Sequence, residues 1–170
     1  YPWTNYRTLF LAHFMAGDSP GLLYYRISDG QSTLATWLSA MADEFEQVVG
    51  KFGKNLRSAL KKGSDAEKLG EALAADLGAH RREGVILYVD ELDRIPFDAD
   101  FQKFARALVG SLPSHAQIAF NSRLLTYQPW YDMVAQGDAV VLGTEYRKDD
   151  VMFTVQEHPR PQLEVYAFGR

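Results

Sequence analysis

Two adjacent carboxylates, Asp90 and Glu91, come directly after the apolar run at 85–89. A continuous apolar run rich in β-branched residues is typical of a parallel strand buried on both faces. Open α/β sheets bind ligands at the carboxyl ends of such strands. One acid at that edge can hold a magnesium ion that carries phosphates, and a second can orient or deprotonate an attacking water. We therefore predict Asp90 as a magnesium ligand and Asp90 with Glu91 as the catalytic pair of an active protein. The alternative is that both acids simply end a strand in a solvated loop.

The next predicted strand, 117–120, ends in a second group of polar residues, Asn121, Ser122 and Arg123. A guanidinium group pairs with phosphate oxygens through two parallel hydrogen bonds. These three residues are therefore predicted to sense or bind phosphate. The alternative is that Arg123 caps the strand end or pairs with a nearby carboxylate. The carboxylates in question are Asp90, Glu91 and Asp93.

A phosphate-binding loop of the form G-x-x-x-x-G-K-[ST], whose amides cradle phosphates at a helix start, is absent from the sequence. In its place, Arg7 and Thr8 stand where Lys-Thr would be, near the start of a predicted helix at 3–16. We name Arg7 and Thr8 as candidate nucleotide-binding residues. Either bulky residues replace the glycine-rich turn or the turn precedes Tyr1. In both cases the strand before the loop, central in such sheets, is missing.

Strands and helices alternate from 21 to 143, which predicts an α/β fold with three layers. The sheet is expected to be mainly parallel, with right-handed crossovers and helices on both faces. Alternating or continuous apolar runs mark the strands, and apolar positions at helical spacing mark the helices. We predict Ser32 or Thr33 and Asp98 as helix caps, and a capping box of Ser64 with Glu67. The predicted strands are 21–27, 85–89, 117–120 and 140–142. The predicted helices are 3–16, 32–49, 64–82, 98–112 and 128–135.

The composition of the 170 residues is that of an ordinary globular domain, with 46% hydrophobic and 24% charged residues. The absence of cysteine excludes disulfide scaffolds, thiolate zinc sites and cysteine nucleophiles. Direct nucleic-acid binding by this chain is a further hypothesis. The net charge of −4 argues against it, because proteins that bind nucleic-acid phosphates usually carry a basic surplus. No apolar run reaches the length of about 18 residues that a membrane span needs. We therefore expect a cytoplasmic location and no membrane partner.

Between 9 and 143 the chain resembles the nucleotide-binding domain of STAND-class regulators, in particular the family of the maltose-regulon activator. The resemblance implies a P-loop NTPase-like fold of the STAND/AAA type, and ATP or ADP with magnesium as cofactor of the parent protein. Asp90 would be the Walker B carboxylate that binds magnesium, and Glu91 the carboxylate that polarises the attacking water. Arg123 would be the residue that senses the phosphate. Since Arg7 replaces lysine, we expect no tight nucleotide binding by this chain. The resembling segments are 8–16, 22–41, 85–95, 100–113 and 117–123.

The C-terminal segment Pro161–Arg170 resembles the opening strand of winged-helix DNA-binding domains in bacterial activators. Together the two resemblances imply an ATPase-like regulatory domain at 1–148, followed at 149–170 by a linker and a strand-like extension. We therefore predict a piece of a bacterial transcriptional activator. Its partners would be other domains of the same activator or a second copy, with DNA bound by a separate downstream domain. An active ATPase whose phosphate loop lies upstream is the alternative.

The missing central strand leads to a structural expectation. Something must fill its place in the sheet, and the C-terminal run 163–168 or a strand from a second copy is the candidate.

Overall fold

Three parallel strands form the largest part of the sheet in a computed structural model that describes residues 21–122, 129–140 and 167–168. The register sets Tyr25 opposite Val89, and Val89 opposite Phe120. The predicted α/β class with parallel strands is confirmed. The predicted helix at 3–16 lies outside the described residues. The three strands are β1 (Leu22–Arg26), β2 (Val85–Asp90) and β3 (Ala116–Phe120).

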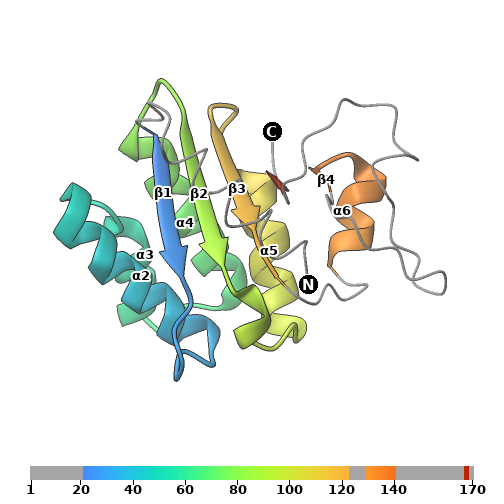
Figure 1. The fold of residues 1–170 in the computed structure, drawn as a ribbon, viewed down its shortest axis with the longest axis horizontal. Helices are drawn as coiled ribbons and strands as arrows, with labels where there is room; N and C mark the ends of the chain where they lie inside the picture. The colour runs from blue at the N-terminus through green and yellow to red at the C-terminus, as the bar shows by residue number, and fades with distance from the viewer. Residues whose placement is uncertain (1–20, 123–128, 141–166, 169–170) are drawn as a thin grey trace, which may run out of the picture.

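The described residues contain five α-helices: three lie between β1 and β2 in the chain, one lies between β2 and β3, and one follows β3 (Figure 1). Thr33 and Asp98 cap α2 and α5 as predicted, each accepting a hydrogen bond from a backbone N–H of the first turn. The predicted capping box of Ser64 with Glu67 was wrong, because the Asp65 carboxylate caps α4 by accepting from the Lys68 N–H at 2.9 Å. The helices are α2 (Leu34–Val49), α3 (Lys54–Lys61), α4 (Ala66–His80), α5 (Ala99–Ser111) and α6 (Trp130–Gln136), with a 3-10 turn, η1 (Leu92–Arg94).

The short helix α3 was not predicted from the sequence. Its N-cap residue, Gly53, has no side chain to accept a hydrogen bond. The buried carboxylate of Asp76 on α4 does this instead, accepting from the backbone N–H groups of Asn55 at 3.0 Å and Leu56 at 2.8 Å. Because the cap comes from a later helix, no local pattern marks where α3 begins.

Aromatic contacts place the helical layer against one face of the sheet. Tyr25 stacks on Trp37 of α2, and Phe120 meets Phe101 of α5, each pair with ring centroids 6.4 Å apart. Tyr25 and Phe120 lie on either side of Val89 in the register, so both rings project from the same face. In Figure 1, α4 and α5 lie behind the strands. The second helical layer that we predicted is not tested, since it depends on residues outside the described ranges.

The helices α4 and α5 cross in close contact at Gly70. A Cβ atom at this position would lie 2.5 Å from the carbonyl oxygen of Phe104 and 2.8 Å from the backbone nitrogen of Leu108. These distances leave no room for any side chain. The glycine therefore sets how closely the two helices that cover the sheet approach each other.

A C-terminal strand, β5 (Ala167–Phe168), lies between β3 and β4 (Ala139–Val140) and is antiparallel to both. Phe168 is opposite Ile118 on one side and Ala139 on the other. We predicted that the run 163–168 would enter the sheet, and its last two residues do so. The order of strands across the sheet is β1-β2-β3-β5-β4.

Candidate functional site

The carboxyl ends of β2 and β3 bring Asp90 and Asn121 together. Asn121 Nδ2 donates to Asp90 Oδ1 at 2.5 Å, and the backbone N–H of Glu91 donates to the same oxygen at 2.9 Å. The backbone holds this edge in register, because the N–H of Asn121 donates to the carbonyl of Val89 at 2.8 Å. Two of the residues predicted for the site therefore meet where adjacent parallel strands end.

The hydroxyl group of Tyr24 on β1 is a third donor to Asp90, reaching Oδ2 at 3.0 Å. Burial, followed by the charge and the hydrogen bond of Asp90, raises the pKa of Tyr24 to about 12. The phenol therefore remains a proton donor to Asp90 at neutral pH. Tyr24 was not among the residues predicted for the site. The parallel pairing of β1 with β2 is the signal that could have found it, because Arg26 lies opposite Asp90 in the register and Tyr24 lies two residues before Arg26, on the same face.

Both carboxylate oxygens of Glu91 are held by arginines that the sequence analysis did not select. Arg26, the last residue of β1, donates from Nε to Glu91 Oε1 at 2.9 Å and from Nη2 to the same oxygen. Arg94 of η1 donates from Nε to Glu91 Oε2. The hydrogen bond and the charge of Glu91 raise the pKa of Arg26 above its usual value. The spacing of Glu91 and Arg94, three residues apart around a turn, is the signal that could have predicted the second pair.

The ion pairs continue to the loop after β1, where Arg94 Nη1 pairs with Asp29 Oδ1. Four charged side chains thus form a chain, Arg26–Glu91–Arg94–Asp29, across the carboxyl edge of β1 and β2. The two end members are well exposed, with 59% of the Arg26 side chain and 95% of the Asp29 side chain accessible. The chain lies at the surface, where ion pairs are screened by water and salt.

The remaining predicted site residues are one buried serine and three residues outside the described ranges. Ser122 is buried, with 2% of its surface exposed, so its hydroxyl lies inside the domain rather than at the surface edge. Arg7, Thr8 and Arg123 lie outside the described residues. Their predicted roles in phosphate binding therefore stay predictions.

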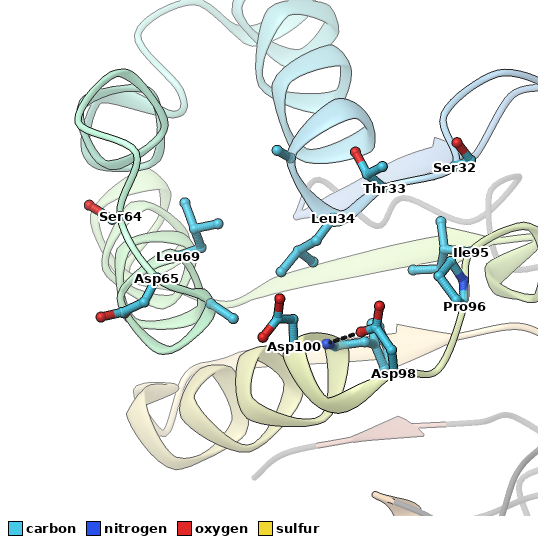
Figure 2. Close-up of a pocket in the computed structure, with 13 residues that line it drawn as sticks. Ser32, Thr33, Leu34, Ser64, Asp65, Leu69, Ile95, Pro96, Asp98 and Asp100 are labelled. Atoms are coloured by element: carbon cyan, nitrogen blue, oxygen red, sulfur yellow. Dashed lines mark hydrogen bonds between the residues drawn. The ribbon is translucent and has the colours of Figure 1, made fainter.

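A groove of about 470 Å³ lies between the N-termini of α2, α4 and α5, apart from the acid pair (Figure 2). Its polar wall includes the three helix caps, Thr33, Asp65 and Asp98. The backbone and side-chain hydrogen bonds from Lys68 hold the pKa of Asp65 below its usual value. These acids satisfy helix ends, so capping explains why they line the groove.

The magnesium nucleotide implied by the resemblance fits this edge only in part. Asp90 offers a carboxylate at the strand end, and a phosphate-bound Mg²⁺ usually needs only one or two protein carboxylates. Glu91 does not fit the role of water-activating acid as it stands, because both of its oxygens accept hydrogen bonds from arginines. Within the described ranges, no group of three or more His, Asp or Glu side chains is placed to hold a metal ion by itself.

Comparison with protein-family models and with curated proteins gives no match for this chain. In the part of the chain that the structure describes, none of the helices has the length and the apolar character of a membrane span. The site must therefore be judged on its own geometry.

Proposed function

We propose that this chain is a regulatory, NTPase-like signalling domain of a bacterial transcriptional activator, and that it acts as an interaction or switch module rather than as a catalyst. The observation that carries the proposal is the edge where β2 ends in Asp90 and Glu91. Asn121 of the neighbouring strand donates to Asp90, while two arginines hold Glu91. The fold would be of the P-loop NTPase type, and the chain's own resemblance to STAND regulators supplies the link to transcription.

One feature of this edge supports an NTPase-like site that recognises phosphate, and another supports a role other than catalysis. A buried parallel strand that ends in an acid pair, with an amide side chain from the next strand on the first acid, suits the binding of a metal-bound phosphate. By contrast, both oxygens of the second acid already accept hydrogen bonds from guanidinium groups, which compete with an attacking water for that carboxylate. The arrangement thus favours recognition over hydrolysis.

The partners follow from the same proposal. The module would contact other domains of the same activator or a second copy of itself, and DNA would be bound by a separate domain. The acidic net charge of −4 agrees with this division, because a surface that binds phosphates of nucleic acid usually carries a basic surplus.

Isothermal titration calorimetry with Mg-ATP tests the proposal, with hydrolysis followed in the same samples. We expect no saturable binding with a dissociation constant below about 1 mM, so any binding free energy is weaker than about 4 kcal/mol. We also expect no ATP hydrolysis above background. The Asp90→Asn variant is the matched control, because asparagine keeps the shape of the side chain and removes its charge. Low-micromolar binding by the wild-type chain that is lost in this variant would overturn the proposal and favour an active ATPase.

A further inference from the structure

Glu91 lies between Arg26 and Arg94 in the position that an anionic ligand would take. Arg26 donates to one carboxylate oxygen and Arg94 to the other, from two different elements, β1 and η1. Guanidinium groups bind phosphate with the same forked geometry that they use for carboxylates. We propose that Arg26 and Arg94 form a binding site for the phosphate group of a ligand, and that the Glu91 carboxylate occupies this site in the resting protein. The inference deepens the proposed function, and it rests on that function only in treating Glu91 as part of the acid pair.

The exposure of the two arginines makes Glu91 replaceable. The side chains of Arg26 and Arg94 are 59% and 26% exposed, while that of Glu91 is 21% exposed. Exposed ion pairs contribute little net stability, since water and salt compete for both charges. A phosphate carries more charge and more acceptor oxygens than a carboxylate, so it binds the same two guanidinium groups more strongly. An incoming phosphate can therefore displace Glu91.

The backbone of Glu91 indicates that its position serves a purpose other than stability. Its φ of 57° and ψ of 42° lie in the left-handed region, which is uncommon for a residue with a side chain. Such conformations cost free energy and are concentrated at functional sites. The backbone on either side is anchored, because the Ile27 N–H donates to the Asp90 carbonyl at 3.1 Å and the Leu92 N–H donates to the Asn121 carbonyl at 2.9 Å. The side chain of Glu91 can thus leave the arginines while the strand edge stays in place.

The carboxylates around the two arginines restrict the kind of phosphate that binds. Asp90 lies beside Glu91, Asp93 follows in η1, and Asp29 pairs with Arg94. A bare phosphate is repelled by these acids, whereas a phosphate that arrives with a divalent cation offsets them. We therefore assign the site to a magnesium-bound phosphate or diphosphate group. Its binding would release Glu91 and change the charge that this edge presents to a partner.

Pyrophosphate with Mg²⁺, titrated into the full chain and followed by thermal shift and ³¹P NMR, tests the inference. We expect Glu91→Ala to bind pyrophosphate about tenfold more tightly than the wild-type chain, because the exposed ion pairs no longer compete. Adding Arg26→Ala or Arg94→Ala to that variant should abolish the gain. Glu91→Gly is the second variant, since glycine suits the positive φ and keeps the fold if alanine does not.

The matched control is Glu83→Ala, which removes one surface ion pair, that of Arg81 with Glu83 at 3.2 Å. This variant should bind pyrophosphate no better than the wild-type chain. Equal affinity of Glu91→Gly and wild-type chain, or a gain that survives loss of Arg26, would overturn the inference. The Mg-ATP titration concerns the wild-type chain, in which Glu91 holds both arginines, whereas this comparison measures the gain when Glu91 is removed, so either expectation can fail while the other holds.

Discussion

Asp76 and Glu91 are both carboxylates held by nitrogen donors, but the two regions around them differ in kind. Asp76 lies in the helical layer with 6% of its surface exposed and accepts three hydrogen bonds, two of them from backbone N–H groups of α3. Glu91 lies at the carboxyl edge of the sheet and accepts from two arginine side chains. Two of the three donors of Asp76 belong to the folded backbone, whereas both donors of Glu91 are side chains that are partly exposed to solvent.

The difference indicates which acid the fold depends on. Removing a buried acceptor leaves donors without partners, and each such group costs about 1–3 kcal/mol. Removing an exposed partner costs little, because water replaces it. The region of Asp76 is therefore structural, and the region of Glu91 is free to exchange partners.

The largest effect is expected at Asp76. Asp76→Ala should lower the free energy of unfolding by about 3 kcal/mol, because the start of α3 loses its cap. Urea unfolding followed by circular dichroism measures this change. The control is Glu71→Ala, an exposed position on the same helix, with an expected change of about 0.5 kcal/mol or less. Equal effects at both positions would show that the cap does not stabilise the domain.

The crossing of α4 and α5 gives the next largest effect. Gly70→Ala should cost about 2 kcal/mol, since the new methyl group meets backbone atoms of α5 at 2.5 and 2.8 Å and the helices must separate. Gly110→Ala on α5 is the matched control, because a Cβ there meets nothing within 4 Å. It should raise stability by about 0.5–1 kcal/mol, the usual gain of alanine over glycine in a helix. Changes of the same sign in both variants would contradict the described packing.

A much smaller effect is expected at Glu91. Glu91→Gly loses two partly exposed ion pairs and gains a residue suited to φ of 57°, so the free energy of unfolding should change by less than about 1 kcal/mol. The same urea titration measures it. A loss as large as that of Asp76→Ala would mean that Glu91 is a structural residue after all.

The smallest effect appears only at alkaline pH. Tyr24 keeps its proton to about pH 12 in the folded protein, mainly through burial and then through Asp90, whereas an unfolded tyrosine loses it near pH 10. Since the folded state binds the proton more tightly, this contribution to stability is complete below pH 10 and is lost between pH 10 and about 12. Stability of the wild-type chain should therefore fall more steeply than that of Tyr24→Phe over this range. Parallel curves for the two proteins, measured by thermal melts, would argue against the buried Tyr24–Asp90 bond.

Much of the fold could be predicted because its signals are local. The apolar run before Asp90 and the caps at Thr33 and Asp98 predicted β2, α2 and α5 from neighbouring residues alone. The start of α3 could not be predicted, because its cap is Asp76, which only the folded packing of α4 brings there.

The residues of the candidate site also divide into those with a local sequence signal and those whose role depends on the folded structure. Asp90 and Asn121 were predicted because each follows its own strand, and parallel pairing brings strand ends together. Tyr24, Arg26 and Arg94 were missed because their role depends on which strand neighbours β2 and on how the turn after Glu91 folds. The roles of Arg7, Thr8 and Arg123 remain predictions.

The most direct test of the central claim, that the Glu91 edge exchanges its partner while the helical layer does not, is an NMR titration of the wild-type chain. The arginine Nε–H signals are followed while pyrophosphate with Mg²⁺ is added. Arg57 is the internal control, because it also pairs with carboxylates but is fixed to the carbonyls of Ala42 and Phe52 at 2.6 and 3.1 Å. The account predicts saturable shifts for Arg26 and Arg94 and none for Arg57. Shifts of equal size at all three arginines, or none at Arg26 and Arg94, would contradict it.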